Sequence, residues 1–212
     1  MHPYHTAGFP GPCGPLKIRF AMETLVRSFY ARDSRRVARN LLGQHLVRTL
    51  KGHRLRGRIL ETEAYLGSQD SASHAYRGQT PRNAPMFGPA GVAYVYFVYG
   101  RHHMFNVVTG HDGEPGAVLI RSIEPLEGRA EMERRRGKKG PVLTNGPGKL
   151  CQALGVDRSL SGWDLTIGQK IWLEKGDPLP DRKVLSGPRV GIAYATAKDR
   201  MAHWRFMLES DR

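Results

Sequence analysis

The sequence predicts one domain that combines helices with antiparallel β-hairpins, on three observations. A length of 212 residues suits one large domain with a core of its own. Two pairs of apolar segments, each joined by a short turn, have the alternation of β-hairpins. Other segments place apolar residues at helical spacing. Because neither an internal repeat nor an interdomain linker follows residue 30, we expect residues 21–212 to form a single domain.

The composition indicates a polyanionic partner inside the cell. The chain has 33 Lys and Arg against 19 Asp and Glu, a net charge of +14 at pH 7. Nucleic acid is the first candidate, because phosphate contacts supply most of the non-specific affinity of basic proteins, and an anionic membrane surface is the alternative. No run is long and apolar enough for a transmembrane helix, and no signal-peptide pattern is present. We therefore expect an intracellular protein that is not inserted in a membrane.

Cysteine and histidine usage predicts no metal site. Cys13 and Cys151 have neither metal-binding nor redox spacing, which favours a reducing compartment. The chain has nine histidines but no HExxH pattern, and we interpret His102 and His103 as a loop or strand pair rather than as ligands.

A tail and two helices are expected before the first hairpin. Residues 1–20 are dense in Pro and Gly and lack periodicity, so we expect a flexible N-terminal tail. A helix is predicted over residues 21–30. A clearer one has Asp33 or Ser34 as its N-cap and ends at Gly43.

The two predicted hairpins are separated by a long loop. Residues 44–50 and 55–66 form the first pair of strands, and residues 92–100 and 104–109 form the second. Residues 67–91, rich in Ser, Gly, Pro and Asn, lie between the hairpins. Loops of this length inside a compact domain are usually functional.

The second half of the chain alternates between strands and helices. Residues 117–123 are predicted to be a buried strand. Pro125 is expected to open a helix that runs to about Arg136, and a further helix should follow Gly146. Strands and short helices that close the fold are expected at residues 165–174, 190–194 and 204–208.

The strand of residues 58–66 carries the strongest signal for a functional site. Alternation places Ile59, Glu61, Glu63 and Tyr65 on one face. Two carboxylates beside an aromatic ring form a poor core and a plausible active site. The alternative is an edge strand whose acids pair with some of the many arginines. Alternation does not distinguish Glu61 from Glu63 as the reactive group.

Three cationic features could serve the acids or a phosphate. Arg121 interrupts an apolar strand, so Glu61 or Glu63 is its natural partner if the sheet is continuous. The run 134–139 is either a phosphate-binding loop or a solvated charge run. Lys149, at the start of the helix after Gly146, is a candidate phosphate ligand; the segment is not a nucleotide-binding P-loop because Leu150 replaces the required Ser or Thr.

The aromatic residues of the second hairpin suggest base flipping. An enzyme that acts on a base in a duplex removes it from the stack, reads it in an aromatic pocket and fills the gap with a wedge. Tyr99 is next to Gly100 at the hairpin tip, where a wedge would lie. Tyr94 is interpreted as a residue that packs the sheet.

Five segments closely resemble the alkyladenine (3-methyladenine, or N-methylpurine) DNA glycosylase family. They are residues 58–67 (RILETEAYLG), 79–83 (QTPRN), 94–100 (YVYFVYG), 119–128 (LIRSIEPLEG) and 146–154 (GPGKLCQAL). The resemblance implies a monomeric, single-domain α+β enzyme with a curved, mainly antiparallel sheet surrounded by helices and without a helix-hairpin-helix. It also implies a DNA repair enzyme without metal or cofactor that hydrolyses the N-glycosidic bond of damaged purines in double-stranded DNA and leaves an abasic site.

The resemblance also implies roles for individual residues. It selects Glu63 over Glu61 as the general base that activates water, with Arg121 orienting the water or the base. Tyr65 and His74 would stack on one side of the flipped base and Tyr96 on the other.

Further roles concern selectivity and DNA contact. Asn106 matches the residue that crowds the 2-amino group of normal guanine, and Tyr99 matches the intercalating tyrosine. Residues 101–105 (RHHMF) depart from the aromatic-rich pattern of the family. The phosphate ligands would be Lys149 and, from the basic run, Arg134, Arg135, Arg136, Lys138 and Lys139.

These roles imply a preference among damaged bases and a reaction that stops at the abasic site. An aromatic sandwich favours cationic alkylated bases such as 3-methyladenine and 7-methylguanine, whereas hypoxanthine and ethenoadenine need a proton on the departing purine. No lysine occupies the position of a Schiff-base nucleophile, so we expect a monofunctional enzyme without lyase activity. A non-catalytic nucleic-acid-binding protein and an RNA-modifying hydrolase are the alternatives.

Overall fold

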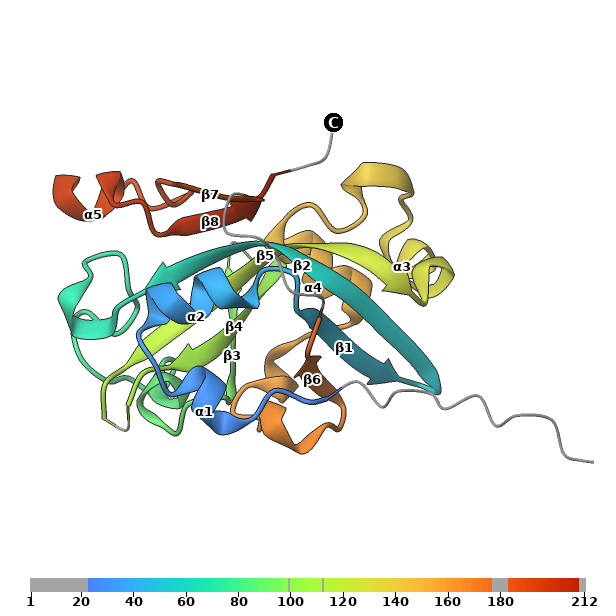
Figure 1. The fold of residues 1–212 in the computed structure, drawn as a ribbon, viewed down its shortest axis with the longest axis horizontal. Coiled ribbons are helices and arrows are strands. Elements are labelled where there is room, and N and C mark those ends of the chain that lie inside the picture. Colours follow the sequence, from blue (N-terminus) through green and yellow to red (C-terminus); the bar gives the residue numbers. More distant parts are fainter. Residues whose placement is uncertain (1–22, 99, 112, 177–182, 210–212) are drawn as a thin grey trace, which may run out of the picture.

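A computed structural model describes residues 23–98, 100–111, 113–176 and 183–209 (Figure 1). The tail predicted over residues 1–20 and the predicted wedge Tyr99 lie outside these described residues. The described part is a single α+β domain around one antiparallel sheet of eight strands, which confirms the expected fold class.

The strands of the sheet run in the spatial order β3-β4-β5-β2-β1-β6, with β8 added beside β2 and β7 beside β8. The strands are β1 (His45–Leu50), β2 (His53–Tyr65), β3 (Ala93–Val98), β4 (His102–Thr109), β5 (Gly116–Glu127), β6 (Ile171–Glu174), β7 (Val184–Gly187) and β8 (Arg205–Leu208). The helices are α1 (Arg27–Tyr30), α2 (Ser34–Leu41), α3 (Arg129–Arg136), α4 (Pro147–Leu154) and α5 (Ala197–Met201). Short 3₁₀ turns cover Gly67–Gln69, Ala84–Phe87, Gly140–Val142, Arg158–Leu160 and Leu165–Ile167.

The first long helix and both hairpins follow the predictions. The Asp33 carboxylate caps α2 by accepting the backbone N–H of Arg35 at 2.8 Å and of Arg36 at 3.4 Å. The pairs β1–β2 and β3–β4 are antiparallel neighbours. The first hairpin turns over only Lys51 and Gly52, because Leu50 already pairs with His53.

Three predicted elements are wrong in extent. The helix expected over residues 21–30 covers only Arg27–Tyr30, since Thr24 forms a β-bridge with Glu174. The helix does not begin at Pro125, because β5 continues its pairing with β2 as far as Glu127 and α3 begins after Gly128. Residues 190–194 contain no regular element. In each case long-range packing overrides the local pattern.

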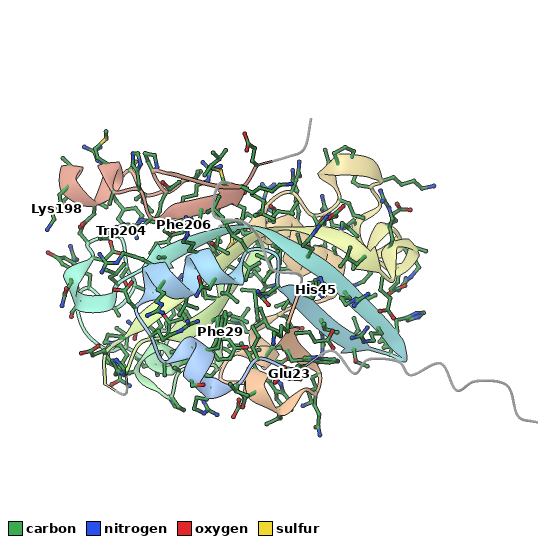
Figure 2. The ribbon with its side chains drawn as sticks, viewed as in Figure 1. Glu23, Phe29, His45, Lys198, Trp204 and Phe206 are labelled. Carbon is green, nitrogen blue, oxygen red and sulfur yellow. The ribbon has the colours of Figure 1, made fainter. Side chains whose placement is uncertain are left out.

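The sheet has one face for the core and another for the site. On one face, α2 and α4 pack on strand residues such as Ile59, Phe105 and Ile120 in a single hydrophobic core. The opposite face is partly covered by the loop after β2 and by the segment between β7 and α5, whose Ile192 and Ala195 cluster with Ala72 against Tyr65. The C-terminal segment that contains β7, α5 and β8 is drawn in red (Figure 1). Figure 2 labels Phe206 on β8 and Trp204 just before that strand.

Candidate active site

A double irregularity in the β2–β5 pairing places the acidic residues on the site face. Ile59 pairs with Ile123 and Glu61 with Ser122, so Leu60 is an extra residue on β2, and Arg121 is an extra residue on β5. Bulges of this kind re-aim side chains. The alternation expected from Ile59 onward is therefore wrong, because Ile59 belongs to the core whereas Glu61 and Glu63 face the other side.

Glu63 is fully buried, and both oxygens of its carboxylate have polar partners. Its Oε1 accepts the backbone N–H of Val190 at 2.7 Å and lies 3.2 Å from Nη1 of Arg121. Its Oε2 accepts the Tyr65 hydroxyl at 2.9 Å. Burial raises the pKa of Glu63 above the ordinary value, against the opposing effects of Arg121, the Val190 N–H and Tyr65. These partners hold the carboxylate in one orientation, and burial makes its charged form less favourable than in water.

Arg121 bridges the two acids, which confirms the predicted pairing. Its Nε donates to Oε1 of Glu61 at 2.8 Å while Nη1 faces Glu63. Arg205 on β8 also donates to Oε1 of Glu61, at 2.6 Å. Burial alone would lower the pKa of Arg121, but the charges of Glu63 and Glu61 raise it, so the guanidinium stays charged. Glu61 is thus an anchor for two arginines, whereas Glu63 has one arginine and two neutral donors.

Beside these residues lies a small, partly open cavity of about 30 Å³ between two walls. One wall is the small cluster of Ala72, Ile192 and Ala195, against which Tyr65 packs. The other is the cluster around Tyr94, with Tyr96 packed against it. The cavity is lined by Tyr65, Ala72, His74, Met86, Tyr94, Tyr96, Asn106, Ala117 and Tyr194. The mixed aromatic and polar lining suits a planar ligand, although the cavity as it stands has room for little more than a water molecule, because its rings pack against each other.

The aromatic rings around the cavity are in mutual contact. The His74 and Tyr96 ring centroids are 4.5 Å apart in an edge-to-face arrangement, and Nδ1 of His74 lies 2.8 Å from the Tyr94 hydroxyl. Loss of water around the ring, with the nearby Arg82 charge, lowers the pKa of His74 to about 4. A base stacked between two rings needs about 7 Å. A base between His74 and Tyr96 therefore requires the His74 ring to turn outward.

Tyr94 and Asn106 lie at the inner end of the cavity. Tyr94 is buried in the sheet, as predicted, and its hydroxyl also holds His74. Asn106 is buried on β4 opposite Tyr94, and its amide donates to the Tyr94 carbonyl at 3.1 Å. These contacts fix the Asn106 side chain against the space that a bound base would occupy.

The basic run lies apart from the cavity. Gly128, just before α3, abuts Leu55 near the start of β2, whereas Glu63 lies near its end. Arg134, Arg135 and Arg136 form the last turn of α3, which ends at Arg136 as predicted, and Arg134 pairs with Glu131 at 2.6 Å. Arg135 and Arg136 bond to Gln152 of α4, and Lys138 and Lys139 are exposed.

Lys149 lies closer to the second hairpin. The first turn of α4 packs on β4, where Gly148 leaves room for the ring of His102. The Lys149 ammonium donates to Asn145 Oδ1 at 2.8 Å and is near the strand that follows the hairpin tip.

Sequence reasoning missed four site residues. Val190 donates its N–H to Glu63, and Tyr194 lines the cavity while its hydroxyl donates to the Ala72 carbonyl at 2.9 Å. Asp70 and Arg189 form a buried ion pair behind Tyr65. Their partners are more than a hundred residues away in the chain, and no local pattern signals such contacts. A single aspartate such as Asp70 in a polar loop gives no indication in the sequence that it is buried.

The described residues have neither a metal-ligand cluster nor a helix that could span a membrane. They contain no group of three or more His, Cys, Asp or Glu side chains that could hold a metal ion. In the same part of the chain, no helix has the length and apolar character needed to cross a membrane.

Comparison with known proteins assigns the family. A family model described as methylpurine-DNA glycosylase matches residues 28–212. The relative from Desulfitobacterium hafniense is 47% identical over 202 residues, covering 90% of this chain and 98% of its own. The relative from Carboxydothermus hydrogenoformans is 48% identical over 189 residues, covering 89% of this chain and 96% of its own. The relative from Methanocella arvoryzae is 45% identical over 187 residues, covering 87% of this chain and 92% of its own. All three are named "Putative 3-methyladenine DNA glycosylase". The predicted family is confirmed: the chain belongs to the methylpurine-DNA glycosylase family.

Proposed function

We propose that this protein is a DNA repair glycosylase that excises damaged purines from duplex DNA by hydrolysis. The observation that carries the proposal is Glu63, a fully buried carboxylate that an arginine and two neutral donors hold beside an aromatic cavity. A protein that only binds phosphates has no use for a buried carboxylate, because its desolvation is costly.

In the proposed reaction, Glu63 accepts a proton from water as the water attacks C1′ of the flipped nucleotide. The new C1′–O bond forms as the N-glycosidic bond breaks, and the electron pair of that bond leaves with the purine. Arg121 orients the water beside Glu63, and its charge favours the ionised carboxylate by opposing the rise in pKa that burial causes. Monomeric enzyme and DNA are sufficient for this chemistry.

Recognition of the base follows from the cavity walls. Aromatic faces attract a cationic ring, and alkylation at N3 or N7 both creates that cation and improves the leaving group. Tyr65 and Tyr96 supply opposite walls, and His74, neutral at physiological pH, turns outward to cover the base. Asn106 excludes the 2-amino group of normal guanine by its fixed position at the inner end.

The remaining proposed roles concern DNA and the products. Tyr99 would fill the gap left by the flipped base, while Lys149 holds a phosphate near the hairpin and the residues of the run 134–139 contact phosphates farther along. Among the described residues that line the cavity there is no lysine, which supports a monofunctional enzyme that leaves the abasic site intact.

The decisive experiment is single-turnover excision from a duplex oligonucleotide that carries one central hypoxanthine, ethenoadenine or 7-methylguanine. We expect wild-type protein to leave an alkali-labile abasic site and Glu63→Gln to bind the same duplex without cutting it. The same lesions in duplex RNA test the RNA-hydrolase alternative. Binding of all these lesions without excision would refute the glycosylase proposal and favour a non-catalytic DNA-binding protein.

A further inference from the structure

An ion pair with no exposed surface lies directly behind the acidic strand. Asp70 and Arg189 both have fully buried side chains, and the guanidinium contacts both carboxylate oxygens, at 2.6 and 2.9 Å. Asp70 also accepts the backbone N–H groups of Leu66 and Ala72 at 3.1 and 3.0 Å. The pair therefore joins the loop that follows β2 to the C-terminal segment, 119 residues away.

Arg189 touches the site from three directions. Its Nη1 donates to the carbonyl of Ala64, the residue after Glu63, at 2.9 Å. Its guanidinium lies 4.7 Å from the centre of the Tyr65 ring and 4.8 Å from that of Trp204. The residue that follows it, Val190, donates its N–H to Glu63 at 2.7 Å.

We propose that Arg189, held by Asp70, is a positioning residue that keeps the Val190 amide and the Tyr65 ring in place around Glu63. The inference rests on the proposed function, because it assigns how the general base is held. The catalytic groups remain Glu63 and Arg121, and Arg189 acts only through the backbone and the Tyr65 ring.

The composition of the pair supports this role over a purely structural one. Burying two charges costs more than burying two apolar side chains of the same volume, so stability alone does not call for this pair. Nε of Arg189 is buried without a hydrogen-bond partner among the described residues, a further cost. A planar guanidinium can hold a carboxylate at one edge and lie over aromatic rings with its face, which an ammonium or an apolar group cannot do.

The Val190 amide affects Glu63 through its charge. A hydrogen bond to the ionised carboxylate favours that form, and the Val190 N–H opposes the effect of burial on the pKa of Glu63. The charged or titratable groups around Glu63 are Glu61 and Tyr65 on β2, Tyr96 on β3, Arg121 on β5, Arg189 before Val190, and Arg205 on β8. A loosened Val190 therefore raises the pH at which Glu63 ionises, if the other groups are unchanged.

The test is the pH dependence of single-turnover excision by Arg189→Lys and Asp70→Asn, with active sites counted by binding of a lesion duplex. We expect the midpoint of the acid limb in the pH–rate profile to rise by about one pH unit. The rate should then fall about tenfold at pH values below the wild-type midpoint and much less at pH values well above it. A merely structural pair would lower the rate by one factor at every pH and leave the limb in place. That result would overturn the proposal.

Glu174→Gln is the matched control. Glu174 is also buried and pairs with Arg54 at 2.6 Å, but Arg54 is nine residues before Glu63 on β2, on the order of 30 Å away. We expect it to lower stability without moving the acid limb. If Glu174→Gln moves the midpoint of the acid limb by the same amount, the shift comes from a general loosening of the fold, and the proposal is overturned.

A measurement on the wild-type protein keeps the inference testable if neither variant folds. The proton resonance of the Val190 amide should titrate with the same midpoint as the acid limb, because its acceptor is Glu63. An amide that does not respond to that titration would refute the proposal. If the wild-type protein excises no lesion, the proposed function itself is wrong. If the wild type is active but the variants leave the midpoint of the acid limb unchanged, only the inference about Arg189 is wrong.

Discussion

The strand pair β2–β5 carries two arginine–glutamate networks that differ mainly in burial. Near the start of β2, Arg54 bonds to Glu127 at 2.6 Å, and Arg58 bonds to Glu124 on the facing strand. These four side chains are 37–45% exposed. Water competes for each charge there, so such pairs contribute between zero and about 1 kcal/mol.

A few residues farther along the same strand, the second network is much less exposed to water. The side chains of Arg121 and Glu61 are 14% and 17% exposed, and that of Glu63 is not exposed at all. The bulges at Leu60 and Arg121 produce this change, because they turn the acids toward the face that the C-terminal segment covers. The first network suits a solvated sheet surface, whereas the second contains a carboxylate, Glu63, whose pKa is raised by burial, as is common for groups in reactive sites.

The largest expected difference is in catalysis. Glu63→Gln should lower the single-turnover excision rate by about 10²–10⁴-fold, because the amide accepts no proton. Glu124→Gln, which changes the partner of Arg58 in the exposed network, should stay within about twofold of wild type. Rates of both variants on one lesion duplex provide the measurement, and equal losses would remove the distinction between the networks.

Stability should separate the networks next. Arg121→Leu leaves two carboxylates without their shared partner, and breaking a buried pair costs about 3–5 kcal/mol. Arg58→Leu should cost less than about 1 kcal/mol. Urea unfolding monitored by fluorescence gives both values. A cost for Arg121→Leu as small as that for Arg58→Leu would indicate that the acids reach water in solution.

The cost of Arg121→Leu should also depend on pH. Without Arg121, the folded-state pKa of Glu63 rises further above its unfolded value, since burial is then opposed only by the Val190 N–H and Tyr65. A raised carboxyl pKa stabilises the fold below the unfolded pKa, and this contribution is lost as pH rises through the folded pKa. Unfolding at pH 5 and pH 8 should therefore show the larger loss at pH 8. A pH-independent loss would point to packing instead of charge.

In the wild type, the same shift should appear in the rate profile. Because burial raises the pKa of Glu63 above 4.5, excision should fall off on the acid side at a midpoint above that value. Single-turnover rates from pH 4 to pH 8 would locate the limb. A midpoint at or below 4.5 would contradict a desolvated general base.

The smallest expected effect is that of salt. At about 1 M ionic strength, salt screens the attraction between exposed charges beyond a few ångströms. The loss of stability caused by Arg58→Leu should therefore shrink toward zero at that salt concentration. The effect of Arg121→Leu should persist, because little solvent reaches that network. Urea unfolding at 0.05 M and 1 M salt measures both, and an equal response would show similar solvent access.

Local sequence patterns predicted much of the fold. Alternation and turn residues identified both hairpins, Asp33 marked the start of α2, and the resemblance identified the family. The prediction of a helix from Pro125 failed because strand β5 gains pairing with β2 there, and Pro125 is tolerated at an irregularity opposite Gly57. Local propensity does not include that gain.

What the sequence by itself determined was the composition of the site: two acids and a tyrosine on one strand, an arginine on another, and tyrosines on a hairpin. Only the tertiary structure decided how these groups differ. Glu63 has its burial, the Val190 amide and the Asp70–Arg189 support because the chain returns to β2 more than a hundred residues later. The two facing bulges decide which side chains enter the site. Both features arise from pairing between distant segments, and no period within a strand encodes them.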